Sequence, residues 1–501
     1  MRTISKFAKI FLVKDKTKQF FLYKHRFTIG YILIGIIFTF LLCILPILVP
    51  GGLSDSEMNA AVTADSINLQ YIKDGNAINL PYFGVQKICL KLLGLNIFAI
   101  RLPSVIFGAA AAFFIVLLLN RWFKNDVAII SSMLTTLSTA FLCLANFGTP
   151  DIMYVFWLSF ILWLGSKIAG NKNIKAIFII LFTSAVAFSL YTPHLCYVAL
   201  AILVVGLIHP HLRCTIKYLK PYQLIIAIAI FLIAITPLIY SLIMTPSSII
   251  NLAFAPDFRF KQYGNNIRDA FMPFFSFALA YDSVYLAPLF GLGTVTLMII
   301  GALASVDKLF TSKNYITILL IIFSILISGL SKNAAVAIIM PVAILTANAI
   351  ESLVTRWHNL FPNNPYAHII GAIPIILIIS MMLFSGLSHY LKGYRYTPRV
   401  TKNFNSDIQI INKEMSAGEI LIIDNEENAD FYRLFEKYKS ITVLNELPSN
   451  FNTRVAFLGK KADNDKLVLE RIATSSKSRN SDRLYIYTKV SETVKTEETG
   501  E

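Results

Sequence analysis

Residues 127–168 read VAIISSMLTTLSTAFLCLANFGTPDIMYVFWLSFILWLGSKI, which is two long apolar runs separated by a short turn. A helix needs roughly 17–25 apolar residues to cross a bilayer, so each run is long enough to span a membrane. Asp151 stands at the head of the second run. Carboxylates at a membrane boundary are costly and usually functional. The stretch therefore predicts a polytopic membrane protein with a functional acidic residue at one surface.

The whole chain has the composition of a membrane protein. Of its 501 residues, 56% are hydrophobic and 15% are charged, whereas about 25% of the residues in a soluble domain are charged. We therefore expect a mainly α-helical, polytopic membrane protein with about 11 transmembrane helices. The apolar runs that predict them are 27–49, 103–119, 127–147, 151–168, 174–190, 193–209, 221–245, 283–303, 314–330, 334–350 and 367–387.

Lysine and arginine alternate between the two ends of these runs, which predicts the orientation. Residues 1–26 are rich in both, as cytoplasmic segments are. The turns at 147–150 and 190–193 carry neither and are expected outside. The alternation then places 51–102 and 246–282 in large outer loops and the C-terminal segment outside. The predicted location is a bacterial-type cytoplasmic membrane with a cytoplasmic N-terminus.

This topology accounts for the net charge of +16. Basic inner connections also attract anionic membrane lipid, which we expect as a partner. No nucleic-acid partner is needed to explain the charge. The five cysteines are scattered without metal-ligand spacing, so we expect buried free thiols and no metal site. They are Cys43, Cys89, Cys143, Cys196 and Cys214.

The composition divides the chain into parts. Residues 1–390 are expected to form the membrane body, 395–490 a small extracytoplasmic α/β domain, and 491–501 a disordered tail. Asp424 is expected to be a structural residue at a strand end. The predicted strands of the small domain are Ile420–Ile423, Ile441–Leu444, Val455–Leu458 and Leu484–Tyr487, and the predicted helices are Phe431–Tyr438 and Lys466–Ala473.

The first outer loop, 51–102, begins with two acidic residues, Asp55 and Glu57. A mixed stretch up to Asn76 follows, and it is expected to lie as a helix on the membrane surface. Charge tracking puts these acids on the same side of the membrane as Asp151.

A second helix of this loop opens at Pro81-Tyr82. Lys87 and Lys91 lie one turn apart on its basic face, opposite apolar residues, which is typical of an interfacial helix. The loop ends in Arg101-Leu102-Pro103-Ser104, where the second span starts.

In this order, the segments resemble the GT-C superfamily of integral-membrane glycosyltransferases. The nearest branch is the protein O-mannosyltransferase and aminoarabinose transferase type, glycosyltransferase family 39. The likeness covers about residues 27–350, and the order and common sidedness of its segments carry it. Besides the acidic segment, these segments are Pro81-Tyr82, Lys91-Leu92-Leu93-Gly94, Arg101-Leu102-Pro103-Ser104, Thr149-Pro150-Asp151, Tyr191-Thr192-Pro193-His194, Ser331-Lys332-Asn333 and Pro341.

Two departures from the family pattern stand out. The family has adjacent Asp-Glu in the first loop, whereas this chain has Asp55-Ser56-Glu57. One alignment puts Ser56 at the family's aspartate and Glu57 at its glutamate, and sliding by one makes Asp55 the aspartate. Some members also have a lysine before the Pro-aromatic segment, where this chain has Asn79.

The resemblance implies transfer of a sugar from a polyprenyl-phosphate donor to a protein, lipid or glycan acceptor at the extracytoplasmic face. It implies Asp55 or Glu57 as the base, with Asp151 as its partner. The residues expected to bind the donor phosphate are Lys332, Arg268, Lys87 and Arg259, with Lys261 as an alternative. The residues expected at the substrate groove are Tyr82, His194 and Arg101.

The chemistry asks for these residue types. A carboxylate must take the acceptor's proton as the new bond forms. The leaving phosphate is already a stable anion, so cations that hold it suffice. No glycine-rich nucleotide loop is visible, which fits a lipid donor. The acids do not require a divalent metal, although one is compatible with them.

Each candidate also has an ordinary structural interpretation. Asp55 and Asp151 are suited to helix capping, Arg101 to anchoring a span, and Lys87 to binding lipid headgroups. Two other functions fit a polytopic chain, namely a transporter or lipid flippase and a non-catalytic assembly factor in glycan biogenesis. A transporter usually shows paired halves or broken helices at mid-membrane, and the sequence shows neither.

Overall fold

The computed structural model divides into two compact units, Met1–Leu41 and Leu42–Glu501. The described part of the first unit is the beginning of helix α3 (Arg26–Leu48). All other elements belong to the second unit. Most basic N-terminal residues, Cys214, Asp424 and the predicted tail at 491–501 lie outside the described residues. The structure describes residues 26–169, 176–208, 220–254, 259–276, 284–306, 311–360, 365–423, 428–448, 451, 453–462, 467–475 and 483–489.

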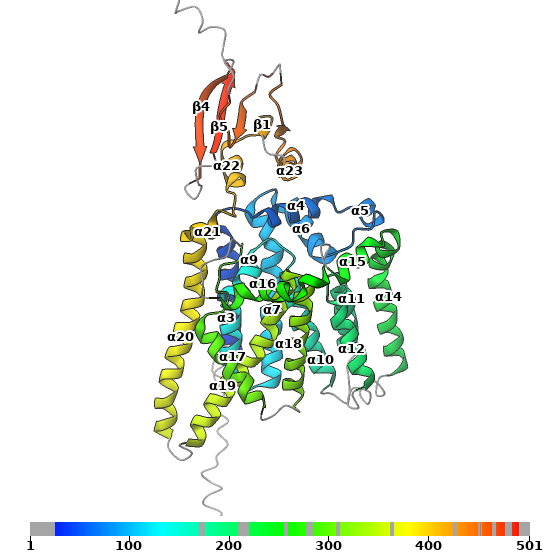
Figure 1. Cartoon of the computed structure of the whole chain (residues 1–501), viewed down its shortest axis with the longest axis vertical. Helices are drawn as coiled ribbons and strands as arrows, with labels where there is room; N and C mark the ends of the chain where they lie inside the picture. The colour runs from blue at the N-terminus through cyan, green and yellow to red at the C-terminus, as the bar shows by residue number, and fades with distance from the viewer. Residues whose placement is uncertain are drawn as a thin grey trace, which may run out of the picture. The chain divides into compact units, whose positions relative to one another are not determined.

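Long apolar helices make up the body of the second unit (Figure 1). Each predicted apolar run coincides with helical structure, and the run at 127–147 is divided between two helices. These helices are α7 (Ile97–Trp122), α8 (Asn125–Thr136), α9 (Thr139–Asn146), α10 (Ile152–Ala169), α11 (Ala176–Ser189), α12 (Cys196–Ile208), α14 (Pro221–Met244), α17 (Leu292–Val306), α18 (Ser312–Leu330), η2 (Lys332–Ile338), α19 (Ile339–Leu360) and α20 (Pro365–Tyr396).

Among the described residues, 6 helices are long and apolar enough to cross a membrane, or 7 if α8 and α9, which are bent by 62°, form one span. Three further apolar helices are shorter, at Ile32–Leu48, Ala176–Ser189 and Leu292–Val306. The structure is therefore mostly helical and rich in apolar helices, as predicted. The count of 11 spans stays a prediction.

The predicted span at 283–303 differs from the observed helix. Helix α17 begins only at Leu292, and the preceding residues 284–291 are irregular. Pro288 and Gly291 lie in this segment, and both disfavour a helix interior. The segment instead packs against α20, because Tyr394 Oη accepts from Leu286 N at 3.1 Å and donates to Val284 O at 3.0 Å.

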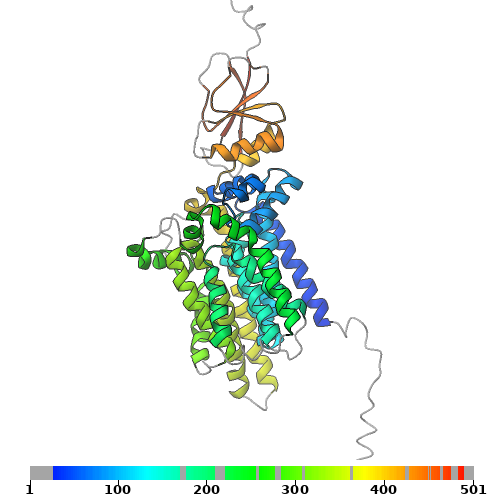
Figure 2. The same ribbon diagram turned by 90° about the vertical axis from the view of Figure 1, so that its right-hand side faces the viewer.

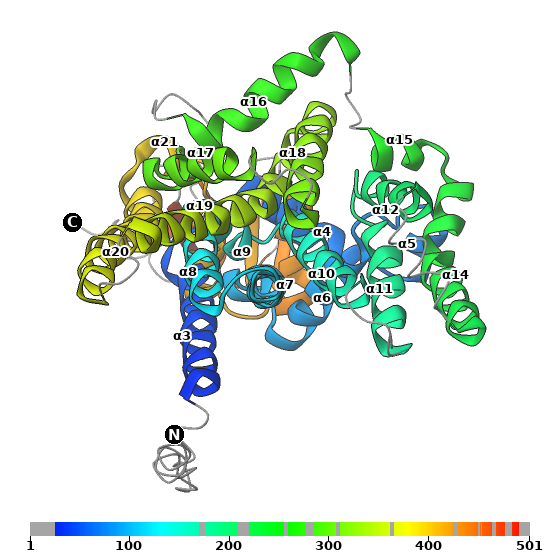
Figure 3. The same cartoon turned by 90° about the horizontal axis from the view of Figure 1, so that it is seen from below.

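Short helices form the loops between the long ones. In the first loop, Ser54 caps α4 through a reciprocal capping box with Glu57, and Pro81 occupies the first turn of α6. Figure 3 looks along the long helices and shows α6 beside α7 and α7 beside α10, which are contacting pairs. The short elements are α4 (Asp55–Ser66), α5 (Leu69–Lys73), α6 (Leu80–Leu93), α15 (Ser247–Ala253), η1 (Phe260–Gln262), α16 (Tyr263–Phe275), α21 (Pro398–Thr401) and α22 (Asp407–Glu414).

The C-terminal part holds a mixed five-stranded sheet of order β2-β1-β3-β5-β4. Strand β1 pairs in parallel with β2 and β3, whereas β5 is antiparallel to β3 and β4. Helix α23 lies between the sheet and α4 (Figure 2). The elements are β1 (Ile420–Ile423), α23 (Ala429–Lys439), β2 (Thr442–Leu444), β3 (Val455–Leu458), β4 (Leu467–Thr474) and β5 (Arg483–Lys489).

The predicted helix at Lys466–Ala473 is wrong, because Leu467–Thr474 is strand β4. Its register runs from Leu467 opposite Lys489 to Thr474 opposite Arg483. This edge strand is mostly exposed, so it lacks the alternation of apolar and polar residues that usually identifies a strand. Cross-strand pairing with β5 fixes its conformation instead.

One buried apolar cluster joins the first loop, residues 51–102, to the C-terminal sheet. Leu53 and Met58 of the first loop share this cluster with Ile411 of α22, Leu421 of β1 and Phe435 of α23. A common core of this kind favours a fixed arrangement of the elements that contribute to it. The predicted domain boundary near residue 395 falls at the end of α20, and the division into domains stays a prediction.

Candidate functional site

A fully buried ion pair joins Glu57 of α4 to Arg101 of α7. Arg101 Nε lies 2.6 Å from Glu57 Oε1, and Arg101 Nη2 lies 3.0 Å from Glu57 Oε2. Both side chains have no solvent exposure. A buried pair of this kind is stable only when geometry and additional hydrogen bonds satisfy both ions.

Two backbone amides complete the surroundings of the Glu57 carboxylate. Ser54 N donates to Oε2 at 2.9 Å, and Gly148 N donates to Oε1 at 2.9 Å. Gly148 immediately precedes Thr149-Pro150-Asp151. The first acidic segment and the turn that carries Asp151 are therefore joined by one carboxylate, although they lie almost a hundred residues apart in sequence.

The remaining donors of Arg101 bind backbone carbonyls. Nη1 donates to Pro46 O at 2.9 Å and to Pro50 O at 3.1 Å, and Nη2 donates to Gly52 O at 2.5 Å. Arg101 thus fixes the end of α3 and the start of the loop to α7. This arrangement accounts for arginine at the position, because only guanidinium presents so many donors in one plane.

Helix α6 is held against the same turn by buried polar contacts. The hydroxyls of Tyr82 and Ser104 lie 2.7 Å apart, and Ser104 Oγ donates to Thr149 O at 3.2 Å. Gln86 Nε2 donates to Ile100 O at 2.9 Å and more weakly to Gly148 O at 3.4 Å. Elements α4, α6 and α7 therefore converge on the turn at 147–151.

Asp151 is buried at the head of α10, with 8% exposure. Its Oδ2 accepts from Thr149 Oγ1 at 3.2 Å and from Tyr285 Oη at 3.0 Å. Burial raises the pKa of Asp151 above 3.8, and the two hydrogen bonds offset only part of that effect. Both contacts use Oδ2, so they leave Oδ1 available to a substrate proton.

His194 lies in the turn after α11, at a positive φ of 63°. Its Nδ1 lies 3.2 Å from Tyr154 Oη. Tyr154 is on α10, about one helical turn after Asp151. Burial lowers the pKa of His194 from 6.5 to about 4, so the imidazole is neutral at physiological pH. A neutral ring with one nitrogen bound to Tyr154 has its other nitrogen available to a ligand or water.

Several buried polar atoms around this turn have no hydrogen-bond partner within the described part of the chain. Buried polar groups are nearly always paired with protein, water or ligand. These atoms are therefore candidate partners for ordered water or for the hydroxyl groups of a bound molecule. These atoms are Asn79 Oδ1, Gln86 Oε1, Asn146 Oδ1, Trp157 Nε1, Thr192 Oγ1 and His194 Nε2.

Asp55 faces elsewhere. It occupies the exposed first turn of α4, and its Oδ1 accepts from Asn428 Nδ2 at 3.2 Å. The structure thus brings Glu57 to the Asp151 turn and brings Asp55 to the C-terminal part of the chain. The sequence left open which of the two acids would meet Asp151.

The predicted phosphate-binding residues fall into separate places. Lys332 and Arg268 both pair with Asp269, at 3.4 Å and 3.1 Å, at the exposed side of α16. Lys332 begins η2, which contacts α10. Arg259 is exposed at the start of η1. Lys87 has its ammonium at the end of α4, where it donates to the carbonyls of two residues, Asp65 and Ile67.

The three predicted groove residues are buried. Tyr82 and Arg101 have no exposure and His194 has 2%. Their polar groups contact Ser104, Glu57 and Tyr154 respectively. Among the described residues, no group of three His, Cys, Asp or Glu side chains is arranged to hold a metal ion. Cys43, Cys89, Cys143 and Cys196 are free thiols, and the first and last of these are only partly buried.

Residues 81–240 match a protein-family model described as dolichyl-phosphate-mannose-protein mannosyltransferase. The matched segment includes Arg101, Asp151 and His194. Over this segment, the chain resembles that family. No curated protein matches the chain in sequence.

Several solved structures are similar. ArnT from Cupriavidus metallidurans in the apo state is 11% identical, with a TM-score of 0.48 over 92% of this chain and 98% of that chain. The structure of the same protein bound to undecaprenyl phosphate is 11% identical, with a TM-score of 0.45 over 92% of this chain and 98% of that chain. A third similar structure is the oligosaccharyltransferase AglB from Archaeoglobus fulgidus in complex with an inhibitory peptide and a dolichol-phosphate. It is 11% identical, with a TM-score of 0.48 over 81% of this chain and 64% of that chain.

The sequence did not identify three contributors to this site. Gly148 and Ser54 act through backbone amides, which leave no residue-type signal. Tyr285 was assigned to a membrane span, although it binds Asp151 from the irregular segment before α17. The nearby Pro288 was a usable signal against a helix there.

Proposed function

We propose that the chain is a membrane glycosyltransferase that moves a sugar from a polyprenyl-phosphate donor to a protein, lipid or glycan acceptor. The observation that carries this proposal is the contact of Glu57 with Gly148 N, which joins the first acidic segment to the Asp151 turn. The family match over residues 81–240 includes that turn. The relatives named above include structures with undecaprenyl phosphate and dolichol-phosphate, which are ligands of the same chemical class.

Asp151 is the carboxylate best suited to act as the base. The acceptor hydroxyl attacks the anomeric carbon, the bond from that carbon to the donor phosphate breaks, and the hydroxyl proton passes to Asp151 Oδ1. The polyprenyl phosphate leaves as an anion. A raised pKa brings a carboxylate closer to the working pH and makes it a stronger proton acceptor.

Glu57 acts as a positioning residue in this proposal. Its two oxygens already accept from Arg101, Ser54 N and Gly148 N, so no lone pair faces a substrate in a useful geometry. Asp55 is exposed and meets the C-terminal part of the chain instead. The base role that the family pattern gives to its first acidic motif is therefore reassigned to the second acidic site.

Lys332 and Arg268 are the cations that best fit the donor phosphate. They are exposed, they lie on either side of Asp269, and Lys332 begins a segment that contacts α10. A phosphate can replace Asp269 as their counter-ion without any new charge being buried. The buried polar atoms around Asp151 are then partners for the hydroxyls of the sugar.

The proposed topology keeps eleven spans, a cytoplasmic N-terminus and an extracytoplasmic C-terminal domain in a bacterial-type cytoplasmic membrane. The apolar helices and the absence of basic residues from the turns at 147–150 and 190–193 support it. The three shorter apolar helices and α12 would complete their spans with adjacent residues. Cysteine-accessibility labelling from the outside at position 55, which is exposed in the first loop, tests the orientation.

The decisive experiment compares Asp151→Asn with the unmodified protein. Cells with and without the chain are first profiled for glycans and lipid-linked sugars, which identifies donor and acceptor, and transfer is then measured with purified protein. We expect Asp151→Asn to lower the rate at least ~100-fold, the range of a general base, with the same elution on size-exclusion chromatography. Asp126→Asn, an exposed aspartate at the start of α8, is the matched control.

Two outcomes contradict the proposal. Full transfer by Asp151→Asn would remove the base from its proposed place. Lipid translocation by the unmodified protein, with no sugar transfer to any acceptor, would instead assign the chain to the flippase or transporter class.

A further inference from the structure

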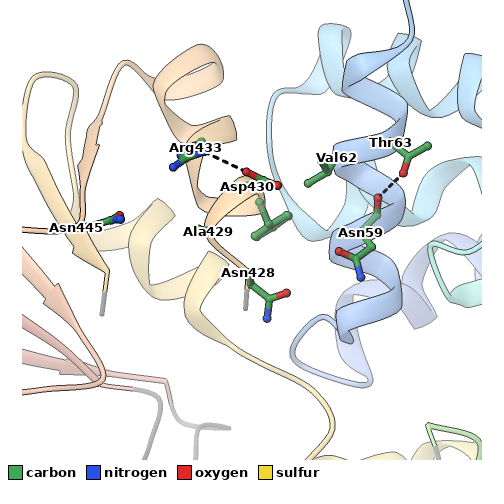
Figure 4. A pocket seen from close by; sticks show the side chains of 9 residues that line it. Asn59, Val62, Thr63, Asn428, Ala429, Asp430, Arg433 and Asn445 are labelled. Atoms are coloured by element: carbon green, nitrogen blue, oxygen red, sulfur yellow. Dashed lines mark hydrogen bonds and ion pairs between the residues drawn. The ribbon is translucent and has the colours of Figure 1, made fainter. Parts of the chain in front are cut away.

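A polar cleft separates α4 of the first outer loop from α23 of the C-terminal part. Its volume is about 520 Å³, within the usual range of ligand sites. Figure 4 shows Val62 of α4 on the side facing the start of α23, with Asn445 on the side of the cleft away from α4. The lining residues are Asn59, Val62 and Thr63 from α4, Asn428, Ala429, Asp430, Phe431 and Arg433 at α23, and Asn445 after β2.

Amide side chains dominate the polar part of this lining. Asn59, Asn428 and Asn445 each offer two N–H donors and one carbonyl acceptor. A sugar hydroxyl is likewise both donor and acceptor, so neighbouring amides match a row of hydroxyls. Val62 and Phe431 supply apolar surface against which the C–H faces of a sugar ring can pack.

The charge in the cleft is balanced. Arg433 Nη1 pairs with Asp430 Oδ1 at 3.2 Å, and these are the only charged residues of its described lining. A phosphate or carboxylate ligand prefers unpaired cations, as at an arginine cluster. The cleft therefore favours a neutral ligand over an anionic one, including the phosphate of a lipid donor.

The two walls are held together independently of any ligand. Asp65 of α4 accepts from Lys437 Nζ at 2.6 Å and from Tyr438 Oη at 2.7 Å, both on α23. The apolar cluster that contains Met58 and Phe435 lies beneath the same two helices. A cleft whose walls are fixed in advance loses little entropy when it binds a ligand.

The cleft is also linked to the proposed reaction site. Asn428, one of its lining residues, donates to Asp55, and Asp55 begins the helix that carries Glu57. Glu57 in turn binds Gly148 N beside Asp151. The hydrogen bonds of Asn428 with Asp55 and of Glu57 with Gly148 N therefore connect the cleft, through α4, to the Asp151 turn.

We propose that this cleft binds a neutral, hydroxyl-rich saccharide that forms part of the acceptor. This inference rests on the proposed glycosyltransferase function and narrows its acceptor from protein, lipid or glycan to a molecule with a glycan portion. The saccharide occupies the cleft while a hydroxyl elsewhere on the acceptor reaches Asp151.

The test measures binding of three neutral trisaccharides, namely mannotriose, cellotriose and N-acetylchitotriose, to the full chain in detergent by saturation-transfer-difference NMR and titration. We expect at least one to bind saturably. The double variant Asn59→Ala/Asn445→Ala should weaken that binding at least tenfold. Glu446→Ala, which changes the exposed neighbour of Asn445 outside the cleft, should leave it unchanged.

The inference is overturned if no trisaccharide binds, if the double variant binds as well as the unmodified chain, or if an Asn- and Thr-containing peptide competes more strongly than any saccharide. Asp151→Asn separates the two proposals, because it should abolish transfer and keep trisaccharide binding. Transfer that is unaffected by Asn59→Ala/Asn445→Ala refutes the cleft alone. Asparagine-dependent binding without any transfer refutes the proposed function alone.

Discussion

Replacing Glu57 by glutamine should destabilise the protein severely, although the two side chains have almost the same shape. In the structure, Oε1 accepts from Arg101 Nε and Gly148 N, whereas Oε2 accepts from Arg101 Nη2 and Ser54 N. Whichever oxygen becomes the NH₂ group, it faces two donors. Neither orientation of glutamine satisfies the site, and Arg101 loses its counter-ion in both.

The magnitude follows from the burial of the pair. Removing one partner of a buried ion pair is destabilising by about 3–5 kcal/mol, because the other charge stays buried without compensation. A typical folded domain has a free energy of unfolding of only about 5–15 kcal/mol. We therefore expect Glu57→Gln to lower the unfolding midpoint on the order of 5 °C or more and to reduce the amount of monodisperse protein.

The assay is thermal unfolding of the detergent-solubilised protein, followed by tryptophan fluorescence and size-exclusion chromatography. Asp55→Asn is the matched control, since it removes a carboxylate from the same first turn at an exposed position and should change stability by less than about 1 kcal/mol. The double variant Glu57→Gln/Arg101→Gln should lose less than the sum of the two single variants, because the unpaired charge is gone.

Two results would refute this reasoning. If Glu57→Gln unfolds at the same temperature as the unmodified protein but has no transferase activity, Glu57 is a catalytic group rather than a positioning residue. Additive losses in the double variant would likewise show that the two side chains do not act as a buried pair.

Three further predictions concern the Asp151 site, the α4–α23 contact and helix packing. Tyr285→Phe removes a hydrogen bond that favours ionised Asp151, so the pKa of Asp151 should rise further and the acidic limb of the pH–rate profile should move to higher pH, with little change on the alkaline side. Burial raises the pKa of Asp65, but hydrogen bonds from Lys437 and Tyr438 outweigh that effect and leave the pKa below 3.8. The ionised Asp65 therefore stabilises the folded protein above the unfolded-state pKa. This stabilisation is lost as the pH falls through the folded-state pKa. Asp65→Asn should therefore unfold more easily than the unmodified chain by ~1–3 kcal/mol at pH 7, with a smaller difference near pH 3, and equal differences at both pH values would contradict the assignment. A Cβ at Gly301 of α17 would lie 2.0 Å from Leu345 O of α19, so Gly301→Ala should reduce stability by about 1–3 kcal/mol, whereas Gly30→Ala, whose Cβ meets nothing within 4 Å, should not.

The length of the apolar runs predicted the helices of the membrane body, because a membrane helix is recognised by its length and hydrophobicity. It failed where backbone chemistry mattered more than composition. The run at 283–303 is mostly apolar, but Pro288 and Gly291 delay the helix until Leu292. The residues before Leu292 are therefore not helical, and one of them, Tyr285, donates a hydrogen bond to Asp151.

The C-terminal part shows the same division. Strands β1 and β3 are buried and apolar, so their pattern predicted them correctly. Strand β4 is an exposed edge strand whose conformation depends on pairing with β5, and residues 467–474 alone do not reveal that partner. Tertiary context overrides local pattern most easily where a segment has one exposed face.

The site itself required long-range contacts that no single segment encodes. The acidic segment, the Arg-Leu-Pro-Ser segment and the Thr-Pro-Asp turn each had an ordinary capping or anchoring explanation. In the structure, Glu57 binds Arg101 and Gly148 N simultaneously, so the three segments are parts of one buried arrangement. This explains why their order along the chain was more informative than any one of them. The activity of Asp151→Asn decides whether this buried arrangement also positions a catalytic base.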